Sequence, residues 1–560
     1  MNAPLRRRTV LAGSAALWAA GCTPPAASPA APLSRSLSAP AHWVGASHAR
    51  GHRLRSHDAL PPVAVQHRAG ALVLGGGVAG LAAARGYLQR GVQDVHLLEL
   101  EDEPGGNSRA HQLGGMPCPL GAHYLPLPGP QAREVSAWLH ELGLLKQVLG
   151  RTVADERHLC HSPQERLFFE GRWVEGLLPP MEPGSAGLRQ MRAFGRAVAQ
   201  LRGDGMGAAP GAAKAATKGA ATNSGPAFAL PAHRSAWGPL QAALDAQTFA
   251  QWLDARGLDD PHLRWYLDYC CRDDYGATPA EVSAWAGVHY FASRHGFQAP
   301  GDEADGGDAE REGVFTWPEG NAWLTQRLAA PLGERLHGGR TVLRVTQGRH
   351  AVEVLAWNEA RQHLEAWTAP QVVVALPLFV AARVVQNPPP ALREAAARLQ
   401  YAPWLVANLQ LDAPLLDRPG APPSWDSVVY GARGLGYVDA MHQSLRPVAG
   451  ATVLTAYHAL PRSERAALLA ENPAPWAERV LAELRPAHPD IQRRVQRIAL
   501  MRWGHAMAIP TPGLQRHPAL QALRGHGLGP GGRLRFAHAD LAGCSVFEEA
   551  FTAGSEAALG

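Results

Sequence analysis

The sequence predicts an α/β (α+β) fold. A discontinuous Rossmann-like nucleotide-binding domain is built from both chain ends, and a substrate domain of mixed sheet and helices is inserted between its parts. Three observations lead to this prediction: a strand–helix–strand pattern with a glycine-rich turn begins near residue 69, a strand and a helix end the chain, and a long, mainly helical stretch separates them. The 560 residues are enough for two or three hydrophobic cores.

Composition shifts along the chain place the domain boundaries. The predicted segments are an export signal at 1–22, a tether rich in Pro, Ala and Ser at 23–65, the nucleotide-binding domain at 66–150, 313–385 and 501–560, and the substrate domain at 151–312 and 386–500. Residues 203–231 consist largely of Ala, Gly and Ser, so we expect a flexible insertion there.

The N-terminus has the pattern of a targeting segment. Arg7 and Arg8 precede Thr9-Val10-Leu11, and a short apolar run follows from Ala12 to Ala20. This run is too short to span a bilayer, and the arrangement resembles a signal read by the twin-arginine export machinery. The alternative is an ordinary secretory signal that carries arginines. Cys22 lies at a candidate lipoprotein cleavage site, so we expect a periplasmic or otherwise extracytoplasmic protein with Cys22 as a candidate membrane anchor.

The positive charge of the chain comes almost wholly from arginine. Lys plus Arg number 53 and Asp plus Glu 48, and lysine occurs only at positions 146, 214 and 218. No basic stripe is interleaved with aromatic residues, which argues against nucleic acid as a partner. No Cys or His spacing suggests a metal site. Cys270 and Cys271 are interpreted as two buried thiols, with a vicinal disulfide as the alternative.

The glycine-rich turn lies between a predicted buried strand, Ala69 to Leu74, and a predicted helix, Val78 to Gln89. Its spacing is that of a dinucleotide-binding turn, in which glycines allow a tight turn and a close approach of the backbone to the pyrophosphate. The predicted phosphate-binding residues are Gly75, Gly77, Val78, Ala79 and Gly80. Glu99 ends the second strand, 19 residues after Gly80, where a carboxylate can accept from ribose hydroxyls. The alternative is a glycine-rich turn without a ligand.

The residues after this strand resemble those of flavin-containing amine oxidases. In that family an acid is followed six residues later by paired glycines, as Glu99 is here by Gly105 and Gly106. The resemblance implies FAD as the cofactor, with Gly105, Gly106, Asn107 and Ser108 along its ribityl and pyrophosphate part. The segment from Pro119 to Tyr124 is similar to the one that passes the flavin ring in the family, which implies contacts from Gly121 and Ala122.

Distant segments extend the resemblance from residue 71 to residue 558. Thr341 to Val345 resembles the strand on the adenine side, which implies a contact from Val342. Arg535 to Asp540 resembles the closing strand and its acid beside the flavin, and Val546 begins a segment like the final helix, whose N-terminus faces the flavin ring in the family. The resemblance therefore adds Val342, Asp540 and Val546 to the cofactor site.

Two family features are missing. The lysine that holds a water at flavin N5 falls near Asn408 by the match of 403–411, and no lysine follows position 218. One aromatic wall of the family's substrate cage falls at Ala506, and the other falls at Val546 or Phe547. These departures weaken the case for a simple monoamine as substrate.

Several polar and aromatic residues remain as catalytic candidates. They are His123, Tyr124, Asn408, Trp503 and His505. His505 matches the position at which monoamine oxidases bond the flavin covalently, but a packed histidine with non-covalent FAD is the favoured interpretation. Arg272, Asp273 and Asp274 form either a solvated, helix-capping cluster or part of a substrate site.

The sequence thus predicts an FAD-dependent oxidoreductase in which a small-molecule substrate gives a hydride to flavin N5. Two alternatives stay open: a desaturase or dehydrogenase of an apolar substrate, similar to phytoene desaturases and porphyrinogen oxidases, and a non-catalytic flavin protein for electron transfer or assembly. The lining of the cavity beside the flavin ring distinguishes them.

Overall fold

A computed structural model gives the structure of the chain. It describes residues 39–55, 60–203, 225–302, 313–444, 446, 448–524 and 532–559. The predicted export signal, Cys22, residues 23–38 of the predicted tether and most of the 203–231 insertion lie outside the described residues. The described residues fall into one compact unit. Among the described helices, none is long and apolar enough to cross a membrane.

The nucleotide-binding half is organised around a five-stranded parallel sheet. Its order is β13 (Leu336–His337), β4 (Val95–Leu98), β3 (Ala71–Leu74), β17 (Val372–Val374) and β23 (Leu534–Phe536). β3 and β17 are wholly buried, as expected for strands covered on both faces. The first, middle and last parts of the chain all supply strands, so this half is discontinuous, as predicted.

Two long helices pack side by side against this sheet. The predicted helix is confirmed as α2 (Val78–Gln89), and the chain ends in α16 (Phe547–Leu559). A second sheet adjoins, made of β14 (Arg340–Gln347), β15 (Val352–Asn358), β16 (His363–Ala369) and β2 (Val63–Arg68). From the sequence, the largely apolar run from Leu364 to Leu376 is typical of a strand. The structure divides it at Pro370 and Gln371, and β16 and β17 belong to different sheets.

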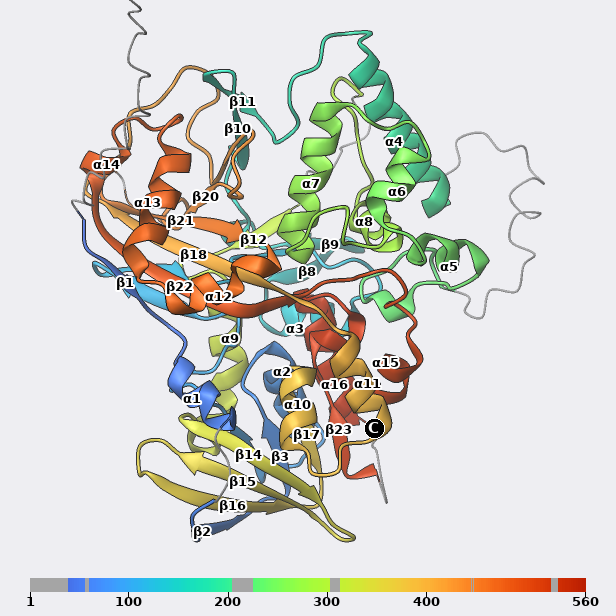
Figure 1. Ribbon diagram of the computed structural model, residues 1–560, viewed down its shortest axis with the longest axis vertical. Coiled ribbons are helices and arrows are strands. Elements are labelled where there is room, and N and C mark those ends of the chain that lie inside the picture. Colours follow the sequence, from blue (N-terminus) through green and yellow to red (C-terminus); the bar gives the residue numbers. More distant parts are fainter. Residues whose placement is uncertain are drawn as a thin grey trace, which may run out of the picture. The chain divides into compact units, whose positions relative to one another are not determined.

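The substrate half contains an eight-stranded mixed sheet (Figure 1). Its order is β1 (Ala41–Trp43), β22 (Val495–Ala508), β18 (Tyr401–Leu411), β21 (Thr452–Ala459), β20 (Tyr437–Asp439), β19 (Asp426–Val429), β10 (Glu165–Phe169) and β11 (Arg172–Glu175). β22 crosses the predicted boundary at 500/501, because this one strand pairs with β18 from Val495 to Ala508.

Helices complete the substrate half. One group is α4 (Ala186–Arg202), α5 (Pro239–Asp245), α6 (Phe249–Asp254), α7 (Pro261–Tyr275) and α8 (Ala284–Ala292). The other is α12 (Arg465–Ala470), α13 (Pro473–Leu484) and α14 (Ile491–Arg494). The sequence from Glu464 to Leu484 predicts helix, and the structure divides it into α12 and α13 because Pro473 starts a new helix at its first position.

Further strands and helices lie between these elements in the chain. They are β5 (Ala110–Leu113), β6 (Met116–Pro119), β7 (Tyr124–Pro126), α3 (Arg133–Glu141), β8 (Leu145–Val148), β9 (Arg151–Ala154), β12 (Val314–Thr316), α9 (Ala322–Ala329), α10 (Leu378–Val384), α11 (Pro390–Arg398) and α15 (Pro518–Leu523). β7 pairs with β12, which carries the chain from the flavin segment back toward the nucleotide half.

Residues 39–55, predicted as part of the tether, are folded onto the body of the protein. They form β1, the short helix α1 (His48–His52) and the 3₁₀ helix η1 (Arg53–Arg55). Leu54 is buried in the nucleotide-half core, and Trp43 lies under the guanidinium of Arg502. These anchoring residues are isolated within a Pro- and Ala-rich stretch without periodicity, which is why the sequence indicated a tether. We call residues 39–55 the N-terminal strap.

Candidate active site

The glycine turn has the geometry that a pyrophosphate requires. Gly75 has φ +100°, and a Cβ there would lie 2.5 Å from the carbonyl oxygen of Ala375. A Cβ at Gly80 would lie 1.8 Å from the carbonyl oxygen of Gly75. Side chains are therefore excluded at both positions. The turn leads directly into Val78 and Ala79, the first residues of α2.

The N-terminus of α2 is open toward a second glycine segment. Gly77 is the N-cap and has no side chain to satisfy the first N–H groups of the helix. A Cβ at Gly77 would meet nothing nearer than the Cα of Gly106, at 3.9 Å. Bare backbone on both sides, with helix N–H groups pointing between, forms a cradle for an anion. The residues present thus fit the pyrophosphate of FAD.

Glu99 is held beside this turn at the end of β4. Its Oε2 accepts from the N–H of Gly76 at 2.5 Å, and its Oε1 accepts from the N–H of Glu101 at 2.9 Å. Burial raises the pKa of the carboxyl group, and the two N–H donors oppose that effect. A carboxylate oxygen can accept more than one hydrogen bond, so Glu99 can also bind ribose hydroxyls.

The other implied cofactor residues lie along the same side of the fold. Val342 is buried on β14 next to an irregularity in its pairing with β15. Asp540 is buried, and its Oδ2 accepts from the Tyr401 hydroxyl at 2.6 Å and from the N–H of Leu378 at 2.8 Å. Burial opposes ionisation of Asp540, but His538 and these donors outweigh it and hold its pKa below the usual range.

The segments expected at the flavin ring are joined to one another by hydrogen bonds. The N–H of Ala122 donates to the carbonyl oxygen of Asn107 at 2.9 Å, and the Asn107 amide donates to the carbonyl oxygen of Ala506 at 2.7 Å. The indole N–H of Trp503 donates to the carbonyl oxygen of Leu120 at 2.7 Å. Two distant parts of the chain, residues 107–122 and 503–506, therefore meet here.

The first expected cage position has no ring, and the only ring at the second position, that of Phe547, packs in the nucleotide-half core. Ala506 is buried and has only a methyl side chain. Val546 precedes α16 and packs against the substrate-half core, whereas Phe547 stacks on Trp138, with ring centroids 6.4 Å apart, in the nucleotide-half core. Ser108 is buried, and its carbonyl oxygen accepts from the Thr325 hydroxyl.

Asn408 and His505 lie apart from one another. Asn408 is fully buried: its amide donates to the carbonyl oxygen of Pro119 at 3.0 Å, and its Oδ1 accepts from the Thr455 hydroxyl at 2.7 Å. It braces the loop that leads to Gly121. His505 is exposed on β22, with its ring centroid 4.7 Å from that of Phe379.

His123 and Tyr124 directly follow the expected flavin segment, Gly121 and Ala122, and line a cavity. The His123 ring stacks on Tyr457, with centroids 4.3 Å apart, and the Tyr457 hydroxyl donates to the carbonyl oxygen of Gly121 at 3.0 Å. Burial lowers the pKa of His123 to about 3, so this imidazole is neutral at physiological pH. The Tyr124 hydroxyl donates to Asp273 at 3.4 Å.

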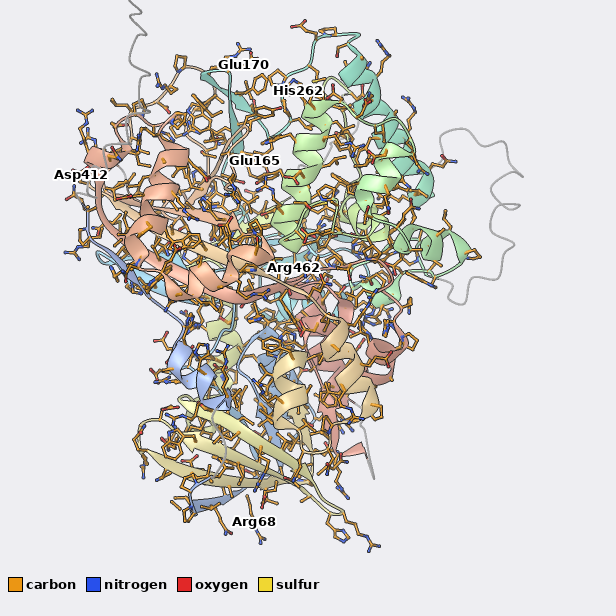
Figure 2. The ribbon with its side chains drawn as sticks, in the orientation of Figure 1. Arg68, Glu165, Glu170, His262, Asp412 and Arg462 are labelled. Atoms are coloured by element: carbon orange, nitrogen blue, oxygen red, sulfur yellow. The ribbon has the colours of Figure 1, made fainter. Side chains whose placement is uncertain are left out.

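The cavity has a volume of about 410 Å³ and is lined by carboxyl groups and aromatic rings. Its carboxyl groups include Glu165, Asp273 and Asp426, and its rings include Tyr266, Tyr269, Tyr290, Phe291 and Trp425. Glu165 and Asp426 are directly paired on the parallel strands β10 and β19, and Figure 2 labels Glu165 beside β10. Three acids from separate parts of the chain therefore line one cavity.

Burial and mutual repulsion change the ionisation of these acids. Burial, together with the neighbouring Asp274, raises the pKa of Asp273 to about 7. Burial, Glu165 and Asp273 raise the pKa of Asp426 well above its usual range. Arg294 also lines the cavity, but it forms an ion pair with Asp274 at 3.1 Å and lies over the Tyr290 ring. The cavity therefore favours a ligand that brings positive charge.

Sequence reasoning found Asp273 as a candidate and missed Glu165, Asp426 and Trp425. No local pattern marks these three, because only the pairing of β10 with β19 brings them to α7. Cys270 and Cys271 are free buried thiols, which confirms the interpretation made from sequence. Among the described residues, no group of side chains is arranged to hold a metal ion.

Comparison with known proteins gives a family match over most of the chain. Residues 78–559 match the family described as flavin containing amine oxidoreductase. No curated protein matches the chain.

Solved structures share the fold at low sequence identity. Wild-type putrescine oxidase bound to putrescine aligns with a TM-score of 0.61 and 17% identity, covering 88% of this chain and 99% of that one. Cyclohexylamine oxidase from Brevibacterium oxydans IH-35A aligns with a TM-score of 0.60 and 18% identity, covering 88% and 98%. A fatty acid isomerase from P. acnes that produces CLA aligns with a TM-score of 0.55 and 13% identity, covering 87% and 97%.

Proposed function

Since this chain belongs to the flavin-containing amine oxidoreductase family and is an FAD-dependent oxidoreductase, we propose that it oxidises a C–N bond of an amine that carries a second positive charge. One observation carries the proposal: Glu165, Asp273 and Asp426 line a single cavity that His123 and Tyr124 also line.

The carboxyl groups favour a cationic substrate over an apolar one. An apolar ligand would remove water from these acids without replacing its hydrogen bonds, which costs free energy. An ammonium group would instead form charge-assisted hydrogen bonds, and the surrounding tyrosine and tryptophan rings would add cation–π attraction. This argument weighs against the desaturase alternative, although the fatty acid isomerase shows that a similar fold can handle an apolar chain.

The cavity residues divide the remaining tasks. FAD, when bound, supplies the hydride acceptor. The neutral imidazole of His123 adds no positive charge that would repel the substrate. The Oδ2 of Asp273 accepts from the Tyr124 hydroxyl, and a pKa of about 7 allows this carboxyl group to take a proton from the reacting ammonium and return it to solvent. Glu165 and Asp426 then hold the second ammonium group.

Anaerobic flavin bleaching tests the proposal. Putrescine and spermidine should bleach the oxidised protein about a hundredfold faster than benzylamine or butylamine, because a monoamine lacks the second charge that aligns its α-carbon. The absence of oxygen separates flavin reduction from reoxidation. Equal or faster bleaching by benzylamine would contradict the proposal and restore an ordinary monoamine oxidase.

We also propose that the protein is exported in folded form through the twin-arginine route, since FAD must be acquired before export. The proposal rests on Arg7 and Arg8. Replacing both by lysine keeps the charge and should leave the protein in the cytoplasm. Unchanged fractionation of this variant would contradict it.

A further inference from the structure

We propose that the N-terminal strap, residues 39–55, is a latch that fixes the loop carrying Glu99 and thereby slows the release of FAD. The inference depends on the FAD site and not on the identity of the substrate. The strap precedes residues 78–559, over which the chain matches its family.

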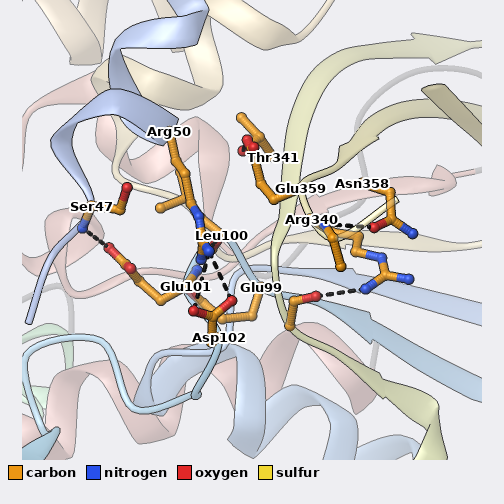
Figure 3. Close-up of polar contacts among 12 residues, drawn as sticks. Ser47, Arg50, Glu99, Leu100, Glu101, Asp102, Arg340, Thr341, Asn358 and Glu359 are labelled. Atoms are coloured by element: carbon orange, nitrogen blue, oxygen red, sulfur yellow. Dashed lines mark hydrogen bonds and ion pairs between the residues drawn. The ribbon is translucent and has the colours of Figure 1, made fainter. Parts of the chain in front are cut away.

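The first anchor of the strap holds the loop that follows Glu99. The N–H of Ser47 donates to Glu101 Oε1 at 2.8 Å, and Arg50 donates to the carbonyl oxygen of Leu100 at 3.2 Å and pairs with Asp102 at 2.9 Å (Figure 3). The N–H of Glu101 in turn donates to Glu99 Oε1. The strap therefore acts on the ribose-binding carboxylate through Glu101.

The second anchor joins the strap to the strand on the adenine side. Arg53 donates to both oxygens of Glu359, at 3.2 and 3.1 Å, and its guanidinium lies 5.0 Å from the Trp357 ring. Glu359 also accepts from the Thr341 hydroxyl at 3.2 Å, and Thr341 immediately precedes Val342. The strap thus contacts both segments expected to flank the adenosine.

The third anchor lies on the substrate sheet. β1 pairs in parallel with β22, from Ala41 opposite Ile498 to Trp43 opposite Leu500. The same strand, β22, continues into Trp503 and Ala506 at the flavin segment. The strap therefore connects the loop after Glu99, expected at the adenosine end of FAD, with β22, expected at the flavin end.

The energetics suit a latch that opens and closes. The Arg50 and Arg53 side chains are 20% and 38% exposed, so each ion pair contributes modestly to holding the strap. Because Leu54 is buried and β1 is paired with β22, the latch opens locally at these two ion pairs and not by detachment of the whole strap. While it is attached, Glu99 is held against the glycine turn. FAD exchange then requires strap opening first.

Release of FAD from the holoprotein tests the latch directly. The double variant Arg50→Ala/Arg53→Ala should release flavin about tenfold faster than wild type, measured as the rise in flavin fluorescence after dilution. Arg55→Ala is the matched control, because Arg55 is an exposed arginine of the same η1 turn with no hydrogen bond among the described contacts, and it should release FAD at the wild-type rate.

A second measurement separates the latch from general destabilisation. Protease cleavage within residues 39–55 should be faster in FAD-stripped protein than in holoprotein, and the double variant should remove that difference. Should the double variant fail to fold, Arg50→Gln alone serves, with an expected smaller acceleration. An unchanged release rate in a folded variant, or equal cleavage of stripped and loaded wild type, would overturn the proposal.

Discussion

The nucleotide site of this protein consists mainly of backbone groups, whereas the substrate cavity consists mainly of side chains. The nucleotide site uses backbone N–H groups, glycines and one carboxylate, most of them within residues 75–108. The cavity uses the side chains of Glu165, Asp273 and Asp426, which come from a strand, a helix and another strand far apart in the chain.

Because of this difference, the two regions tolerate substitutions differently. A backbone cradle binds pyrophosphate whatever the neighbouring side chains are, but it fails when a Cβ or a wrong charge enters it. A cavity of side chains can change its ligand by single substitutions while the sheet beneath it stays intact. We therefore expect a single substitution in the nucleotide site either to abolish FAD binding or to leave it unchanged. A single substitution in the cavity should instead change substrate binding by a graded amount.

The largest effect is expected at Glu99. Glu99→Arg replaces a buried acceptor by a cation next to Gly76, so the purified variant should contain no flavin, measured by the ratio of absorbance at flavin and protein wavelengths. Glu103→Arg is the control, because Glu103 is an exposed acid of the same loop, and this variant should remain yellow. A yellow Glu99→Arg protein would remove the contrast between the two regions.

A smaller, graded effect is expected in the cavity. Asp426→Asn keeps the shape of the side chain and removes its charge, so the second ammonium loses a partner and kcat/KM for a diamine should fall about 10- to 100-fold. Flavin content should not change. Asp412→Asn at the exposed end of β18, labelled in Figure 2, is the matched control and should keep wild-type kinetics. Loss of flavin in Asp426→Asn would show that the two regions are not independent.

The same difference explains what the sequence could predict. The helix Val78–Gln89, Glu99 and the glycine turn were predicted because local spacing determines them, and β23 followed from the resemblance of Arg535 to Asp540. Glu165 and Asp426 were missed because each is an ordinary acid in its own segment. Their importance arises only from the pairing of β10 with β19, a tertiary contact that leaves no local periodicity.

The strap illustrates the same limit at another place. Arg50 and Arg53 lie in a stretch whose composition indicates a tether, and their partners Asp102 and Glu359 are distant in sequence. Ion pairs of this kind have no spacing rule, so composition alone predicted the wrong state for residues 39–55.

Acid pH should lower the stability of the protein through a buried histidine in each half, and this effect is smaller than those of the two substitutions above. Burial lowers the pKa of His289 in the substrate half to about 4, and that of His337 in the nucleotide half, which is more exposed, also to about 4. A histidine whose pKa is lowered by folding contributes stability above its unfolded pKa of about 6.5 and loses it as the pH falls toward the folded value.

Melting temperatures at pH 7 and pH 5 test this expectation. For His289 the free energy of unfolding should fall by about 2 kcal/mol between pH 6.5 and pH 5, because the residue is only 3% exposed. His289→Gln can still donate to the carbonyl oxygen of Ala229, so it should lower the pH dependence of the melting temperature. His337→Gln should lower it less, because solvent screens the more exposed ring. An equal effect of both substitutions would contradict the ranking.

The smallest effect is expected at His505, where we predict none on flavin attachment. If His505 were bonded covalently to the flavin, attachment of the flavin ring would depend on a single side chain. Binding of the pyrophosphate, by contrast, depends on the backbone of the glycine turn. The His505 ring is exposed on β22 and lies against Phe379, a contact sufficient to explain its position without a bond to the cofactor. Acid precipitation should therefore leave the yellow colour in the supernatant for both wild type and His505→Ala, with equal flavin recovery. Colour retained in the wild-type pellet and lost from it in His505→Ala would mean that a single side chain, and not the backbone, secures the flavin ring.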